Sequence, residues 1–153
     1  MIVIDINTLN CNVNTDPLNL FETLQHELTH AKIFSELFLK YGFNVVDHSL
    51  NYYQAFEQLV ISEYGSNATK EQHTLMLEKY LSDMVRSLIE VTGVGTFEAN
   101  YNDYVGLILY GFPLDILESC GYTLGVVQDK YHSYQVFAHN NPDIYTNIKK
   151  LCP

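Results

Sequence analysis

The feature that most constrains this chain of 153 residues is a run of apolar residues spaced for one long helix. The run follows Asp16 and Pro17, which suit the N-cap and the first position of a helix. Gly42 suits its C-terminal end. Between these limits the apolar side chains recur with a period near 3.6 residues, at Leu20, Phe21, Leu24, Leu28, Ala31, Phe34, Leu37 and Phe38. The sequence therefore predicts a helix of roughly 25 residues with one buried face.

The middle of this predicted helix carries the string His26-Glu27-Leu28-Thr29-His30. Side chains four residues apart on a helix project from the same face, so both imidazoles can reach one metal ion. Glu27 lies at the edge of that face, where its carboxylate can touch a metal-bound water without binding the metal. In the H-E-x-x-H arrangement, two histidines bind zinc and the glutamate is the general base of a peptidase. The alternative is a pair of polar side chains on a solvated helix face.

A third metal ligand must come from elsewhere, because catalytic zinc usually takes three protein ligands and one water. We favour His73, which falls in the first turn of a predicted later helix, so that its ring can point towards the long helix. A neutral, metal-bound ring there avoids the unfavourable interaction of a charged histidine with the positive end of the helix dipole. Glu57, in the middle of a predicted second helix, and His48 remain open as alternatives, with Asp47 more distant.

The remaining sequence predicts a mainly helical chain with a minimal amount of sheet. Capping residues and glycine or proline stops predict three further principal helices, at about 50–64, 69–93 and 97–110. The second of these three is expected to begin with a capping box formed by Thr69 and Gln72. We expect a helical turn at about 114–120, a mixed region at about 124–137 and a short helix from Pro142. The β-branched stretch Ile2–Ile6 predicts one strand. Residues 1–153 are expected to form a single domain, with the alternative that the chain is a fragment of a longer protein.

Net charge, hydropathy and cysteine content limit the classes of partner and the cellular compartment that we expect. The formal net charge of −10 argues against a nucleic acid or an anionic membrane surface as the main partner. No apolar run approaches the roughly 20 residues that a membrane span needs. The first ten residues lack the basic region of a signal peptide. Cys11, Cys120 and Cys152 are far apart in the sequence and are expected to be thiols in a reducing compartment. These features predict a cytoplasmic protein.

The stretch from Phe21 to Glu90 resembles zincin-type metallopeptidases, and in particular short phage and Bacteroidetes proteins with SprT-like zinc-peptidase domains. In those proteins H-E-x-x-H-A is followed, after a helix, by a Gln-His-x-x-Met run that opens another helix. This chain has His26-Glu27-Leu28-Thr29-His30-Ala31 and then Gln72-His73-Thr74-Leu75-Met76. The segment 102–107 is loosely similar to a Tyr-rich, Gly-containing helix of the same proteins. Only the H-E-x-x-H motif is specific, and the chain offers one strand where zincins usually have several.

The resemblance implies a helical core built around the long helix, with zinc held by His26, His30 and His73. It implies a peptidase in which Glu27 activates the zinc-bound water and a peptide or protein is the substrate. Two other functions stay open at this point. One is a non-catalytic structural or interaction module stabilised by the same metal, which would tolerate loss of Glu27. The other is an all-helical partner-binding protein without a metal.

Overall fold

The computed structural model describes residues 17–41, 49, 51–65 and 68–149. Within these residues the chain is helical, with short connections and no strand. The helices are α1 (Pro17–Tyr41), α2 (Tyr52–Tyr64), α3 (Ala68–Leu75), η2 (Met76–Tyr80), α4 (Leu81–Thr92), α5 (Phe97–Tyr110), α6 (Leu114–Ser119), α7 (Leu124–Asn140) and α8 (Asp143–Lys149). The predicted mainly helical class is confirmed, and the predicted strand Ile2–Ile6 lies outside the described residues.

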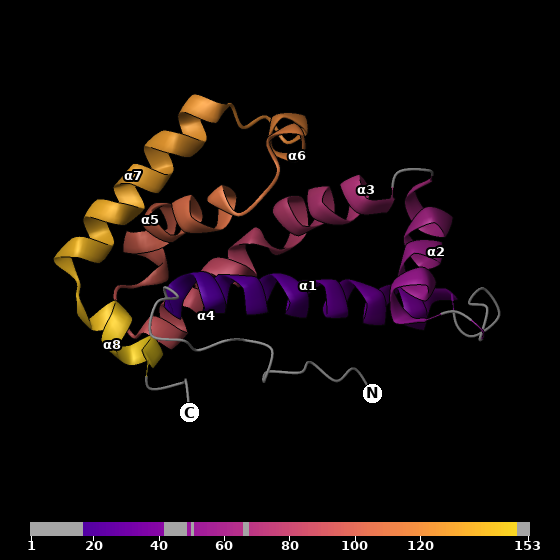
Figure 1. Ribbon diagram of the computed structural model, residues 1–153, viewed down its shortest axis with the longest axis horizontal. Coiled ribbons are helices and arrows are strands. Elements are labelled where there is room, and N and C mark those ends of the chain that lie inside the picture. Colours follow the sequence, from indigo (N-terminus) through magenta and orange to yellow (C-terminus); the bar gives the residue numbers. More distant parts are fainter. Residues whose placement is uncertain (1–16, 42–48, 50, 66–67, 150–153) are drawn as a thin grey trace.

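Three groups of helices pack around one apolar core. Figure 1 shows α1 as a long helix with α2 at its C-terminal end and α8 near its N-terminal end. The segments α3, η2 and α4 form a second long rod that crosses α1, and α5 and α7 pack together on the far side of α4. Fully buried side chains fill the space between these helices, among them Leu59 and Val60 of α2, Leu88 of α4, and Tyr104 and Ile108 of α5. None of the described helices is both long and apolar enough to cross a membrane.

The beginnings and ends of the first two helices follow local capping chemistry. α1 begins at Pro17 as predicted, while the predicted cap Asp16 and stop Gly42 lie outside the described residues. α2 begins two residues later than predicted, because Asn51 rather than Ser49 precedes it and forms a capping box with Gln54. Its predicted stop at Gly65 is confirmed, with the Gly65 amide donating to the carbonyl of Ile61.

The predicted third helix is present, but its start and its interior differ from the prediction. α3 begins at Ala68, so Thr69 lies inside the first turn and the predicted Thr69–Gln72 capping box is wrong. The rod then contains a π-helical segment, η2, before it continues as α4 to Thr92. Gly93 ends the rod in the left-handed conformation, as predicted (φ 62°).

The C-terminal third is more regular than expected. α5 spans Phe97–Tyr110 and α6 covers Leu114–Ser119, as predicted. The expected mixed region at 124–137 is wrong, because a single helix of 17 residues, α7, runs from Leu124 to Asn140 behind a Thr123 cap. The last predicted helix is α8.

Candidate metal centre

Three histidines from two helices meet at one point. His26 and His30 lie one turn apart on α1, and His73 lies on α3. The Nε2 atom of His26 is 3.2 Å from Nε2 of His73 and 3.2 Å from Nε2 of His30. One nitrogen from each ring falls within a cluster whose atoms all lie within 4.8 Å of one another. The structure therefore brings together the three histidines that the sequence singled out.

The two distances of 3.2 Å from His26 are close to the ligand spacing of a tetrahedral metal site. Zinc–imidazole bonds of 2.0–2.1 Å at tetrahedral angles separate the ligand nitrogens by about 3.3–3.4 Å. Hydrogen bonds alone account for the cluster less well. His73 Nδ1 lies 2.9 Å from the carbonyl oxygen of Thr69, so the neutral ring donates from Nδ1 and leaves a lone pair on Nε2. One proton on His26 Nε2 would have to be shared between two neighbouring rings, whereas a cation satisfies three lone pairs at once.

The contact between His73 and Thr69 also orients the ring. Metal-binding histidines commonly donate their second ring N–H to a carbonyl or carboxylate, which fixes the tautomer and the direction of the lone pair. The carbonyl of Thr69 performs this role from the first turn of α3. His30 differs, because its Nδ1 atom is buried and has no hydrogen-bond partner among the described residues.

Aromatic side chains form the wall behind the cluster. The ring of Phe112 lies 5.3 Å from that of His26 and 5.7 Å from that of His73, while Phe56 lies 5.6 Å from His30. Phe56 and Phe112 are buried, and the three histidines are half-buried. This surrounding excludes water from one side of the cluster.

Burial keeps the three imidazoles neutral. Desolvation, with repulsion from His73, lowers the pKa of His26 to about 4. Desolvation, with repulsion from His26 and His73, lowers the pKa of His30 to about 3. Burial also lowers the pKa of His73, against the opposing effects of the Thr69 carbonyl and two nearby carboxylates. Neutral rings with free lone pairs are the form that binds a metal.

Two carboxylates influence the cluster electrostatically. The negative charges of Glu27, on α1, and Asp115, on α6, both raise the pKa of His73. Both side chains are exposed. Glu27 thus stands beside the histidines with its carboxylate in water, as the H-E-x-x-H spacing predicts. Asp115 was not identified from the sequence, and the loop that bears Phe112 brings it here.

The other candidate ligands do not join the cluster. Glu57 is exposed on α2 and is not part of the group of potential ligand atoms found among the described residues. His48 and Asp47 lie outside the described residues. Two further histidines, His132 and His139, are exposed on α7 and do not belong to the cluster.

Sequence reasoning missed the aromatic wall and Asp115. Phe112 follows Gly111 at the end of α5, and nothing in its local pattern distinguishes it from any other core residue. A contact between α3 and α6 brings this part of the chain to His73, and such a contact between distant segments leaves no local signal.

In comparisons with known proteins, no family model matches this chain, and no similar curated protein or solved structure was found.

Proposed function

We propose that the protein is a zinc-dependent peptidase whose metal is held by His26, His30 and His73. The observation that supports this most directly is the convergence of the three histidines beside Glu27, with Nε2 of His26 lying 3.2 Å from Nε2 of each of the other two rings. The resemblance to zincins favours peptide bonds as the substrate class. Two features suit these residues to zinc. The contact of His73 Nδ1 with the Thr69 carbonyl leaves a lone pair on Nε2, and the lowered pKa values of His26 and His30 keep their rings neutral.

Zinc in this site would polarise the substrate carbonyl and make its bound water a usable nucleophile near pH 7. The chain's own residues would do the rest. Glu27, exposed next to the ligands, would accept the proton of the attacking water at a carboxylate oxygen and deliver it to the leaving amine. Phe112 would exclude bulk water from behind His26 and His73.

The metal assignment is tested by zinc content and affinity of protein purified without an affinity tag. The wild type should hold about one zinc per chain, and the double variant His26→Ala/His30→Ala should hold none. His73→Ala should weaken binding by more than the 10–100-fold typical of a residue that only supports a ligand. Glu57→Ala is the matched control and should bind zinc normally. Full binding by His73→Ala with loss in Glu57→Ala would contradict the proposed ligand set.

The catalytic assignment is tested with Glu27→Gln. This variant should keep its zinc and lose hydrolysis of a peptide library by a factor of 10² or more, because the base is gone and the ligands remain. Glu90→Gln, an exposed glutamate on α4, is the control. Equal hydrolysis by Glu27→Gln and wild type would instead favour the metal-stabilised module without catalysis.

A further inference from the structure

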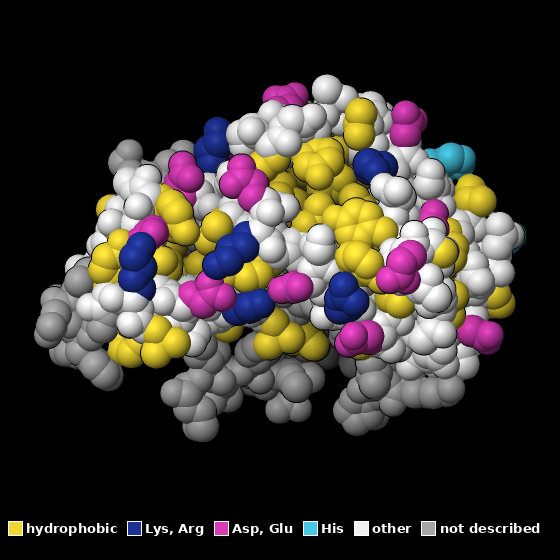
Figure 2. Space-filling view, turned by 180° about the vertical axis from the view of Figure 1, so that it is seen from behind, with side chains coloured by type: hydrophobic (Ala, Val, Ile, Leu, Met, Phe, Trp, Pro, Cys, Tyr) yellow, Lys and Arg dark blue, Asp and Glu magenta, His cyan; other side chains and the backbone are white. Residues whose placement is uncertain are grey.

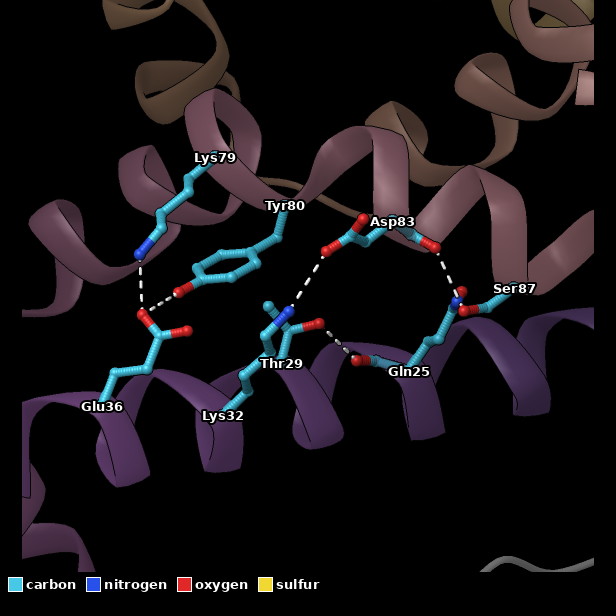
Figure 3. A network of polar contacts seen from close by, with 8 residues as sticks. All are labelled: Gln25, Thr29, Lys32, Glu36, Lys79, Tyr80, Asp83 and Ser87. Atoms are coloured by element: carbon cyan, nitrogen blue, oxygen red, sulfur yellow. Dashed lines mark hydrogen bonds and ion pairs between the residues drawn. The ribbon is translucent and has the colours of Figure 1, made fainter. Parts of the chain in front are cut away.

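A second site lies on the neighbouring face of α1, between α1 and the η2–α4 part of the rod. It is a cavity of about 190 Å³. Its polar lining consists of Gln25, Thr29, Lys32, Asp83 and Ser87, which Figure 3 shows between the two helices. Leu28, Tyr80 and Met84 supply the apolar part of the wall. None of these residues belongs to the histidine cluster.

The arrangement follows from helix periodicity. Gln25, Thr29 and Lys32 are spaced four and three residues apart, so they share one face of α1. His26 and His30 are one residue further along, which rotates them by about 100° around the helix axis. α1 therefore presents the metal ligands and the lining of this cavity on adjacent faces.

One lining residue contains a buried acceptor without a donor. Gln25 is only 6% exposed, and its Nε2 atom donates to the carbonyl oxygen of Met84 at 2.8 Å. This bond fixes the orientation of the amide, because a flipped amide would set two oxygens against each other. The Oε1 atom is then left buried, with no hydrogen-bond partner among the described residues. Such a group carries a desolvation cost that a donor in the cavity would remove.

The other polar groups of the lining also offer acceptors. The hydroxyl of Thr29 already donates to the carbonyl of Gln25, and the hydroxyl of Ser87 donates to the carbonyl of Asp83. Their oxygens keep lone pairs for a further donor. One oxygen of the Asp83 carboxylate binds Lys32 Nζ at 3.1 Å, and among the described residues no ion pair involves the second oxygen. The cavity thus has an excess of acceptors.

The contacts of Lys32 indicate that the wall of the cavity binds cations. The ammonium group of Lys32 binds Asp83 and lies 4.7 Å from the centre of the Tyr80 ring. The Lys32 side chain is half exposed, so this ion pair lies at the rim of the cavity. Breaking an exposed ion pair of this kind costs little free energy, so Lys32 can move away from Asp83. Figure 2, which views the molecule from behind, shows acidic and basic side chains next to one another on the surface, and the net charge of −10 attracts cations to the protein.

We propose that this cavity binds a small organic cation, an ammonium or guanidinium group on a short aliphatic chain. Its N–H groups would donate to Gln25 Oε1, Ser87 Oγ and the Asp83 carboxylate, and its aliphatic part would contact Leu28 and Met84. A cavity of about 150 Å³ accommodates benzene, so this one has room for such a ligand. The proposal does not depend on zinc or on catalysis, because it uses none of the residues of the metal centre.

The test is a titration of the full chain with butylguanidinium and butylammonium, in which binding is measured from amide chemical shifts in NMR spectra. Saturable shifts should appear around Gln25 and Ser87. Asp83→Asn should weaken binding at least tenfold, and because Asp83 is exposed this change should not unfold the protein. Gln25→Met, which keeps the side-chain volume, should also weaken it. Lys32→Met should strengthen binding by vacating the carboxylate, whereas Lys70→Met, the control for lost charge, should change little.

A control ligand and the same variants can contradict the proposal. Butanol, which has the same chain and no charge, should bind at least tenfold more weakly. If butanol binds as tightly as the cations, or if Asp83→Asn and Gln25→Met bind like the wild type, the proposal is wrong. Absence of saturable shifts in the wild type overturns it as well. A parallel titration with N-acetyl-arginine amide distinguishes a peptide side chain from a free amine as the source of the cation.

Discussion

At the scale of single residues, the histidine cluster combines two opposing requirements. Metal binding needs neutral imidazoles with free lone pairs, and burial against Phe112 and Phe56 provides them. The same burial makes the cluster costly to protonate. Without a metal, the three rings are therefore a weak point of the fold in acid.

This cost predicts how the stability of the metal-free protein depends on pH. In the unfolded chain each histidine titrates near 6.5, whereas in the folded protein the pKa is about 4 for His26 and about 3 for His30. Below pH 6.5 the unfolded state therefore binds more protons, and the free energy of unfolding falls as the pH falls. Allowing for solvent screening, we expect a loss of about 1 kcal/mol per histidine at pH 5. Urea unfolding in chelator at pH 7.5 and pH 5 measures it.

The control for this prediction is an exposed histidine. His30→Gln should make the pH dependence shallower, while His132→Gln, on the exposed face of α7, should leave it unchanged. An unfolding free energy that is the same at both pH values would show that the three rings are not buried as described.

At this scale the sequence predicted the residues whose relation is local. The spacing of His26 and His30 places them on one face of any helix. The choice of His73 over Glu57 rested on resemblance and on a predicted position in the first turn of its helix. The predicted position is wrong, because α3 begins at Ala68 and His73 lies in its last turn, but His73 does belong to the cluster. Gln25 and Asp115 could not be predicted, because their roles depend on which helix crosses α1 and on where α6 begins.

At the scale of helices, one glycine shows how closely two elements pack. α5 lies against α7, and a Cβ atom added at Gly106 would overlap the backbone carbonyl of Lys130. We predict that Gly106→Ala lowers the free energy of unfolding by about 3 kcal/mol, because backbone atoms cannot move aside as a flexible side chain can. Chemical denaturation of the variant measures the change.

Gly125 provides the matched control on the partner helix. It lies in the first turn of α7, and an added Cβ would meet nothing within 4 Å. Gly125→Ala should therefore raise stability by about 0.5–1 kcal/mol through the helix preference of alanine. If the two substitutions had equal effects, the close approach of α5 and α7 would be wrong.

The π-helical segment η2 leads to a second prediction at this scale. A π turn contains one residue more than an α turn, because its hydrogen bonds run from residue i to i+5. Deleting the exposed Glu78 should therefore restore a regular α-helix and keep His73 in phase with α4. Zinc affinity of the deletion variant should stay within about tenfold of the wild type. Inserting one alanine after Glu78 should instead rotate His73 by about 100° and abolish binding.

Helices with strong local signals were predictable, and those that depend on their neighbours were not. α5 has a Thr96 cap and a glycine stop, and its predicted limits agree with the structure. α7 mixes β-branched, aromatic and polar residues without a clear apolar stripe, and its packing against α5 stabilises it as one helix. η2 has no known sequence signal, and its Tyr80 side chain donates to Glu36 of α1 only because the two helices cross.

At the scale of the whole molecule, the histidine cluster joins elements that are distant in the sequence. His26 and His30 belong to the long helix α1, whereas His73 comes from the rod, 43 residues after His30. The mainly helical class was predictable, because it depends on local periodicity, whereas the pairing of His73 with α1 was expected only from the resemblance and from the place of His73 on a predicted helix. The order in which the helices pack was not predictable, since it depends on apolar side chains from the whole chain.

This architecture predicts that zinc stabilises the fold as a whole. A ligand that binds only the folded state adds about 2.7 kcal/mol at a free concentration of one hundred times its Kd. For a chain of this size that corresponds to a rise in Tm of roughly 5–10 °C. We expect differential scanning calorimetry to show this rise on addition of zinc and its loss on addition of chelator.

Two variants test whether the stabilisation comes from zinc bound at the histidine cluster. In His73→Ala the link between α1 and the rod is lost, so zinc should shift Tm by less than half as much as in the wild type. Glu27→Gln keeps all three ligands and should show the full shift, even where its hydrolytic activity is lost. An equal shift in His73→Ala would mean that zinc binds elsewhere or through α1 alone. Since stabilisation and hydrolysis respond differently to these two substitutions, the pair separates a metal that holds the fold together from one that also serves a reaction.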